Sequence, residues 1–218
     1  MESVRVPGFL PSANGLRFPN AFARSPFVAV GPVKIGDVSG GLCGGMVFDV
    51  LDRFESKVPP PPDVDVPRAG SPLFRRIRRR AWASFGVPVG PARYYLWQLL
   101  PDRTVARWSA GRSWRAIRAD VAAGRPSPLG LVRVRSANPL ALGRDHQVLA
   151  YGFDQDRSAG TLRILVYDPN HPGDDAVAIE VTGTNGPHAT AVSYLEGEDP
   201  VRGFFRSRYR SKPVSPSG

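Results

Sequence analysis

The sequence predicts an α+β fold in which helices from the N-terminal half pack on a mostly antiparallel sheet from the C-terminal half. Apolar residues recur at helical spacing within residues 41–125, whereas short runs rich in β-branched and aromatic residues dominate residues 126–206. The two kinds of segment do not alternate, which argues against a parallel sheet built from βαβ units. With 218 residues, of which 42% are hydrophobic, the chain is expected to form a single domain over residues 1–210.

The first predicted element after a long N-terminal arm is a helix over about residues 42–54. Residues 1–40 contain several prolines among glycines and few periodic apolar runs, so we expect a loop-rich arm. In the helix, Val47, Val50, Leu51 and Phe54 mark one apolar face. The proline run at residues 59–62 follows, and consecutive prolines cannot continue a helix.

Three more helices are predicted before residue 125. Ser71 followed by Pro72 is a typical helix start, with a hydroxyl N-cap and proline at the first helical position. That helix ends at Gly86, and its arginine-rich part, residues 75–80, is expected to form a solvated face. Helices are also predicted over residues 92–100 and 113–123, the latter capped by Gly124.

The β half is predicted to consist of short strands separated by turns. The candidate strands are residues 129–134, 147–153, 161–167, 176–181 and 189–194, with a further one from Gly203. Clusters of Gly, Asp, Asn and Pro separate them. The Ser-, Pro- and Arg-rich tail, residues 211–218, is expected to be disordered.

Composition and charge bear on where the protein is located and on which partners it can bind. No stretch approaches the roughly 18 apolar residues of a membrane span, so none is expected. No basic leader or apolar signal region is visible at the N-terminus, which favours the cytoplasm, or export without a visible signal peptide. The net charge of +10 would suit binding to nucleic acid, but the cluster at residues 75–80 carries aromatic residues only on its apolar side.

The single cysteine, Cys43, lies where a glycine-rich segment enters the first predicted helix. The N-terminal end of a helix carries partial positive charge and free N–H groups, which favour a thiolate over a thiol. The neighbouring glycines would let a substrate backbone approach closely. These features suit a cysteine nucleophile, although a lone cysteine is also compatible with simple packing in the core.

A base and its partner are available on two later strands. His146 precedes the predicted strand 147–153, and Asp168 follows the strand 161–167. If these strands form a hairpin through residues 155–160, the two side chains lie at the same end of it, where the carboxylate would orient the imidazole. Alternatively, His146 is a surface or capping residue and Asp168 a turn residue before proline. Asn170 is a second candidate partner for His146 if the register differs.

The order of these residues resembles the papain-like cysteine peptidase superfamily, most closely the bacterial double-glycine-leader peptidases and their relatives. The similar segments are Cys43-Gly44 at the helix start, residues 146–154 and residues 166–169, with residues 117–131 similar to the helix, turn and strand before the histidine. The resemblance spans roughly residues 37–170. It implies a papain-like fold with catalytic Cys43, His146 as base and Asp168 as its partner.

One position departs from the pattern of that family. The family usually has a glutamine about six residues before the cysteine, and its amide helps to bind the oxyanion. Asp37 stands at that position here, and an ionised carboxylate cannot donate a hydrogen bond. Ser39 and the backbone N–H of Cys43 are the remaining candidate donors.

The sequence thus favours a cysteine hydrolase, of peptidase or amidase type, that acts on a peptide or protein. The substitution at position 37 favours an alternative, in which a papain-like scaffold binds a protein or peptide without cleaving it. A basic nucleic-acid-binding protein is the second alternative. No phosphate-binding loop, zinc-finger spacing or dinucleotide fingerprint is present, so no cofactor and no metal ion is expected.

Overall fold

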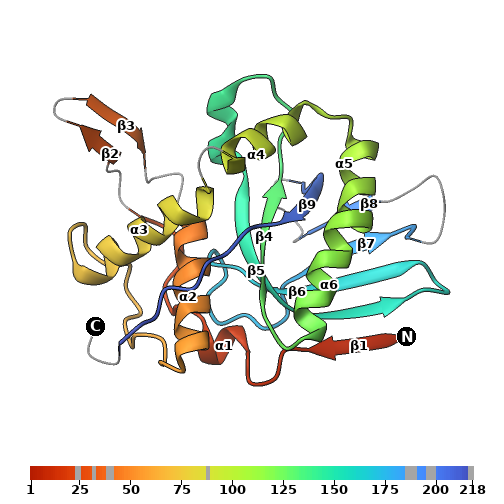
Figure 1. Ribbon diagram of the computed structural model, residues 1–218, viewed down its shortest axis with the longest axis horizontal. Coiled ribbons are helices and arrows are strands. Elements are labelled where there is room, and N and C mark those ends of the chain that lie inside the picture. The colour runs from red at the N-terminus through yellow and green to blue at the C-terminus, as the bar shows by residue number, and fades with distance from the viewer. Residues whose placement is uncertain are drawn as a thin grey trace.

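The chain folds as an α+β protein in which helices flank a curled antiparallel sheet (Figure 1). The computed structural model describes residues 1–22, 26–30, 33–37, 42–86, 89–184, 191–194 and 200–215. The α+β prediction is confirmed, since the helices precede most of the strands in the chain and every pairing in the main sheet is antiparallel.

The main sheet has the strand order β8-β7-β6-β5-β4-β9, and β1 also pairs with β5. Its strands are β1 (Glu2–Arg5), β4 (Ser127–Val132), β5 (His146–Asp156), β6 (Thr161–Tyr167), β7 (Ala178–Thr182), β8 (Ala191–Ser193) and β9 (Gly203–Arg206). The predicted strands are confirmed, and their boundaries differ from the observed ones by at most three residues, except that the start of the strand predicted over 189–194 lies outside the described residues. A separate hairpin of β2 (Pro26–Val30) and β3 (Val33–Asp37) precedes the first long helix.

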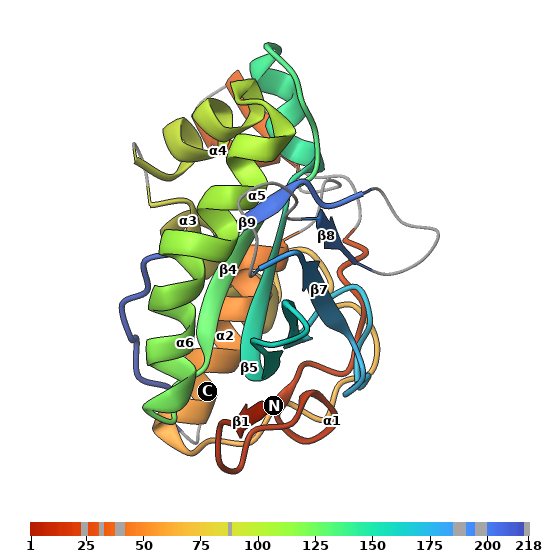
Figure 2. The ribbon, with the colours of Figure 1, turned by 90° about the vertical axis from the view of Figure 1, so that its right-hand side faces the viewer.

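The helices lie on both sides of the central strands. They are α1 (Pro11–Asn14), α2 (Cys43–Ser56), α3 (Pro72–Phe85), α4 (Val89–Leu99), α5 (Asp102–Trp108), the π-helix η2 (Ser109–Ser113), α6 (Trp114–Ala122) and the 3-10 helix η3 (Pro139–Arg144). Strands β4 and β5 lie between α2 and α6 (Figures 1 and 2). None of the helices in the described part of the chain combines the length and the apolar character that a membrane-spanning segment needs.

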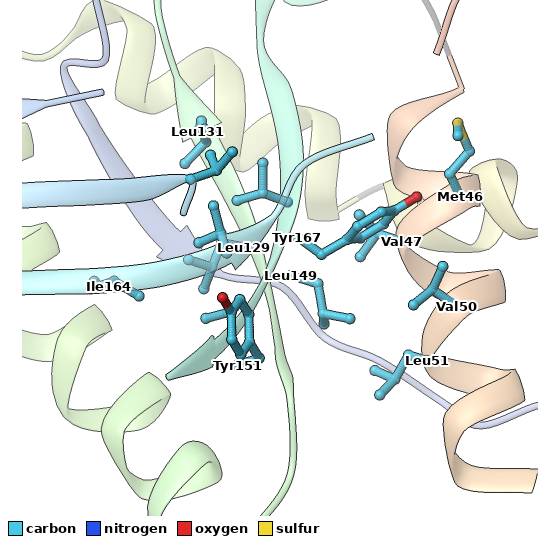
Figure 3. Close-up of a cluster of buried hydrophobic side chains, with 14 of the residues drawn as sticks. Met46, Val47, Val50, Leu51, Leu129, Leu131, Leu149, Tyr151, Ile164 and Tyr167 are labelled. Carbon is cyan, nitrogen blue, oxygen red and sulfur yellow. The ribbon is translucent and has the colours of Figure 1, made fainter. Parts of the chain in front are cut away.

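Helix α2 forms where the apolar spacing predicts it, and its apolar face is buried against the sheet. Val47, Val50 and Leu51 face side chains of β4, β5 and β6 (Figure 3). Burying a side chain of this size stabilises the fold by about 1.5–3 kcal/mol. The helix ends at Lys57, which adopts a left-handed conformation (φ 55°) and donates its N–H back to the last turn.

Helix α3 begins and ends as predicted, but its arginine-rich face is not simply solvated. Ser71 Oγ accepts the N–H of Phe74 at 3.2 Å. Arg80 is buried and forms an ion pair with Asp52 of α2 at 2.8 Å, while Arg76 contacts the same carboxylate at 2.9 Å. The prediction of a solvated face is therefore wrong at these two positions, because the buried carboxylates of α2 require charged partners.

The N-terminal arm is more ordered than its prolines and glycines indicate. Strand β1 pairs with β5 over Glu2–Arg5, and Phe9 and Phe18 are buried in the core. The expectation of a loop-rich arm is thus corrected for its described residues, because long-range strand pairing and core contacts order a segment that carries no periodic pattern of its own.

The C-terminal tail packs across α2, contrary to the prediction of disorder for residues 211–218. The N–H of Lys212 donates to Asp52 Oδ1 at 3.0 Å, and the N–H of Val214 donates to Ser56 Oγ at 3.0 Å. Val214 is buried. These two hydrogen bonds and the burial of Val214 hold residues 211–215 against α2, while residues 216–218 lie outside the described chain.

Candidate active site

Cys43 is the first residue of α2 and is half-buried. Burial raises the pKa of its thiol, but His146 lowers it by charge and by a side-chain hydrogen bond. The backbone N–H groups of Gln147 and Gly44 also donate to the sulfur. The net result is a thiol pKa below its ordinary value of 9.0, as expected for a cysteine that forms a thiolate readily.

His146 and Asp168 lie at the same end of the β5–β6 hairpin, as the sequence predicts. His146 is the first residue of β5, and Asp168 follows the last residue of β6, where Tyr167 pairs with Leu149. The Nε2 atom of His146 lies 2.7 Å from Asp168 Oδ1, and both side chains are buried. Since Nε2 is engaged with the carboxylate, Nδ1 is the ring atom left for the sulfur of Cys43.

The charges on Cys43, His146 and Asp168 each favour the ionised form of the neighbouring side chain. Burial lowers the pKa of His146, but the negative charges of Asp168 and Cys43 outweigh that effect and raise it to about 10. Burial raises the pKa of Asp168, whereas the imidazolium of His146 and the hydrogen bonds to the carboxylate lower it to about 2. At neutral pH this arrangement favours an ion pair of thiolate and imidazolium beside an ionised carboxylate.

Asp168 is held by two donors in addition to His146. The hydroxyl of Tyr194 donates to Oδ2 at 2.5 Å, and the backbone N–H of Asn170 donates to Oδ1 at 2.8 Å. Sequence reasoning missed Tyr194, since it is one of several tyrosines and lies 26 residues after Asp168. The alternative in which Asn170 orients His146 is wrong, because Asp168 occupies that position and Asn170 contributes its backbone instead.

Asn20, also missed from the sequence, connects the cysteine helix to the loop that carries Asp168. Its Oδ1 accepts the N–H of Leu42 at 2.6 Å, directly before Cys43. Its Nδ2 donates to Asn170 Oδ1 at 3.3 Å, and its backbone N–H donates to the carbonyl of Pro169 at 2.9 Å. One side chain therefore ties together the two segments whose separation sets the geometry of the site.

Close packing holds the start of α2 against its neighbours. A Cβ atom on Gly44 would lie 2.1 Å from Ser84 Oγ of α3 and 2.7 Å from the side-chain amide of Gln147. Gln147 follows His146 in β5 and is 4% exposed. Only glycine at position 44 allows α2, α3 and β5 to approach this closely at the residue next to Cys43.

Polar residues outside the candidate triad hold the start of β5 in place. The hydroxyl of Tyr94, in α4, donates to the carbonyl of His146 at 3.2 Å. Asp145 accepts the N–H of Arg133 at 2.9 Å and the side-chain amide of Gln98 at 2.8 Å. Burial raises the pKa of Asp145 to about 6, against the lowering effect of these donors. These contacts fix the strand position of His146 relative to α4.

The residues proposed to bind the oxyanion are only partly described. Asp37 is the last residue of β3 and pairs with Pro26, while its side chain and the whole of Ser39 lie outside the described part of the protein. The N–H of Cys43 has no acceptor within α2, because the first N–H groups of a helix have no partner in the helix itself.

The described residues contain no group of three or more His, Cys, Asp or Glu side chains that could hold a metal ion. Acidic side chains in the segment after β6 have partners within the protein. Asp168 binds His146, and Asp175 accepts the backbone N–H and the hydroxyl of Ser12 at 2.8 and 2.6 Å.

Comparison of the chain with protein-family models, with curated proteins and with solved structures finds no match. The site therefore has to be interpreted from its own geometry, which brings Cys43, His146 and Asp168 together in one hydrogen-bonded series.

Proposed function

We propose that this protein is a cysteine hydrolase with a papain-like fold that cleaves peptide or isopeptide bonds. The observation that carries the proposal is the buried imidazole of His146, which contacts Cys43 on one side and Asp168 on the other. The resemblance of residues 43–44, 146–154 and 166–169 to the papain-like superfamily supports it. So does the position of the cysteine at the start of a helix that packs on an antiparallel sheet.

In the proposed reaction the thiolate of Cys43 attacks the carbonyl carbon of the scissile amide, and the π electrons of that carbonyl move to its oxygen. The carbonyl re-forms as the C–N bond breaks, and the leaving nitrogen takes the Nδ1 proton of His146. A thioester remains. Water then loses a proton to His146, its oxygen attacks the thioester, and the thiolate leaves as the acid is released.

Asp168 remains ionised throughout this cycle. Its carboxylate holds the Nε2–H of His146 and thereby presents Nδ1 to the sulfur and then to the leaving nitrogen. The low pKa of this carboxyl keeps the proton on the ring rather than on Asp168. Tyr194 and Asn170 fix the carboxylate in place.

A papain-like scaffold that binds peptides without cleaving them is the second candidate. The observation that favours it is Asp37 at the position where the family has an amide donor, since a negative charge there would oppose the developing oxyanion. Loss of one such donor typically lowers kcat by about 10²–10³-fold. The lowered pKa of Cys43 favours the hydrolase, because a pure scaffold has no need of an activated thiol.

The arginine cluster at residues 75–80, which suggested nucleic-acid binding, gives this alternative less support in the folded protein. Within residues 75–80, Arg76 and Arg80 are occupied by Asp49 and Asp52 of α2. These two side chains are therefore engaged within the protein and are not available to bind a phosphate backbone.

Thiol labelling tests the activation of Cys43 without knowledge of the substrate. Because the chain has one cysteine, the extent of alkylation by iodoacetamide, read by intact mass, reports on Cys43 alone. The wild-type rate should reach its plateau below pH 9, and at pH 7 it should exceed that of His146→Ala by at least about tenfold. Above a pH of about 10 the ring loses its proton and the ion pair is lost.

Cys43→Ser is the control and should take no label. Equal labelling rates for the wild type and His146→Ala would refute the activated thiol. Fast labelling without turnover of any member of a quenched peptide and isopeptide library would support the binding scaffold instead of the hydrolase.

A further inference from the structure

A cavity of about 610 Å³, separate from the candidate active site, lies among α4, α5, η2, α6 and β9. In both views α4, α5 and β9 gather at one end of the molecule (Figures 1 and 2). Neither Cys43 nor His146 nor Asp168 lines this cavity. Its volume falls in the range of small-molecule sites, which is roughly 300–1,000 Å³.

The wall of this cavity is strongly cationic. Arg93, Arg112, Arg206 and Arg208 line it, and among the residues that the structure describes no carboxylate does so. Arg206 is neutralised by an ion pair with Asp120. Arg112 and Arg208 form no ion pair with any residue in the described part of the chain. The cavity therefore contains guanidinium groups whose charges the described chain does not compensate.

Arg93 is the most enclosed of these cations. Its NH1 group donates to the carbonyl of Arg206 at 3.0 Å, and its guanidinium lies 5.1 Å from the centre of the Phe205 ring. Burial lowers the pKa of Arg93, and the positive charges of Arg208 and Arg112 lower it further. Arg93, Arg112 and Arg208 line the same cavity, so they can act on one bound anion together.

Aromatic rings form the other part of the wall. Trp97 contacts Phe205 edge to face at 5.2 Å and contacts Trp108 in the same way at 5.7 Å. Trp97 is buried, whereas Trp108 is 43% exposed. An exposed indole supported from behind by a buried one is a suitable surface for a planar ring to stack on.

We propose that this cavity binds a small phosphorylated ligand with a planar ring, of the nucleotide class. Several guanidinium groups that line one cavity match a phosphate dianion better than they match a single carboxylate ligand. The exposed face of Trp108 matches a base. A cavity of this size holds one nucleotide rather than a longer strand, so the free mononucleotide is the expected ligand.

The test is titration of the full-length protein with the four ribonucleoside 5′-monophosphates. Calorimetry and tryptophan fluorescence monitor the binding. At least one monophosphate should bind saturably at a 1:1 ratio and quench the fluorescence. Its parent nucleoside and inorganic phosphate should each bind at least about tenfold more weakly, because each lacks one of the two recognition elements.

Two variants locate the binding. The double variant Arg112→Gln/Arg208→Gln should weaken binding about tenfold or more. The single variant Trp108→Ala should weaken it by a similar factor. These side chains are exposed, so the fold should persist, which circular dichroism checks. Arg75→Gln combined with Arg79→Gln is the matched control, since it removes the same charge from exposed positions outside the cavity.

Three outcomes would overturn the proposal. One is the absence of saturable binding of all four monophosphates at millimolar concentration. Another is binding that the cavity variants leave unchanged. The third is a single-stranded oligonucleotide that binds far more tightly than any monophosphate, with an affinity that falls steeply as salt rises, which would identify a nucleic-acid surface instead.

Discussion

At the residue scale, the candidate site depends on a small number of hydrogen bonds that keep one imidazole charged and oriented. His146 is enclosed between a sulfur and a carboxylate, and the carboxylate is itself enclosed by donors. The ionisation of Cys43 therefore also depends, through His146, on residues that do not touch the sulfur. Tyr194 offers the most direct way to show this.

Tyr194→Phe should slow alkylation of Cys43 at pH 7 by about tenfold, because a hydrogen bond to a charged group contributes about 1.5–3 kcal/mol. Loss of the hydroxyl raises the pKa of Asp168 and so lowers that of His146, which weakens the thiolate–imidazolium pair. The pH limit above which the pair is lost should therefore move down from about 10. NMR titration of His146 measures this shift.

The phenylalanine variant keeps the ring that faces the guanidinium of Arg133 at 5.8 Å, so unfolding is not expected. If the midpoint of the His146 titration does not change, Tyr194 has no part in holding the charge of Asp168.

At the element scale, the position of α2 determines where Cys43 meets His146. The helix is held at its start by close packing at Gly44 and by the hydrogen bond from Leu42 to Asn20, and further along by ion pairs with α3. The close approach at Gly44 is the contact most sensitive to a single added atom.

Gly44→Ala should destabilise the protein by about 1–3 kcal/mol, the usual effect of an overpacked core position. The new methyl group would overlap Ser84 and Gln147, and therefore the start of α2 must shift away from β5. Alkylation of Cys43 should slow in parallel. Urea unfolding and the labelling rate are the two measurements.

Gly143→Ala is the matched control, since a Cβ atom there meets nothing within 4 Å and stability should hardly change. Adding Ser84→Ala to Gly44→Ala removes the nearest overlapping atom and should restore part of the stability. The packing argument fails if the single variant is as stable as the wild type.

At the scale of the whole molecule, the two ends of the chain pack on β5 and α2, away from Cys43 and His146. The first strand extends the sheet beside β5, and the last residues cross α2 near Asp52. The buried carboxylate of Asp52 accepts from α3 and from the tail, so it joins three segments that are distant in sequence.

Removal of residues 209–218 should lower the free energy of unfolding by about 2–4 kcal/mol. The truncation exposes apolar surface at Phe48, whose ring packs against Tyr209 at 5.1 Å, and it leaves Asp52 with fewer donors. Thermal unfolding provides the measurement. Cys43 should still be alkylated at close to the wild-type rate, since the tail does not contact the site.

Tyr209→Phe separates the two contributions, because it keeps the ring contact and removes only the hydroxyl that donates to Asp52 at 2.8 Å. A truncated protein with unchanged stability would mean that the tail contacts are energetically neutral.

Most of the local elements and the candidate triad of this protein could be predicted from the sequence alone. Helix α2, the β5–β6 hairpin and the common end shared by His146 and Asp168 follow from apolar spacing and turn residues, which act over a few positions. The weaker pattern of α5 was missed, because Gly111 interrupts the helical run and the chain passes through a π-helix there.

The residues from distant parts of the chain that support the site could not be predicted from the sequence. Asn20 and Tyr194 reach it from opposite ends of the sequence, and Arg76 and Arg80 prove to be ion-pair partners rather than a solvated face. The physical reason is that a buried polar group must find its partner in space, and the position of that partner in the sequence is set by the topology rather than by local periodicity.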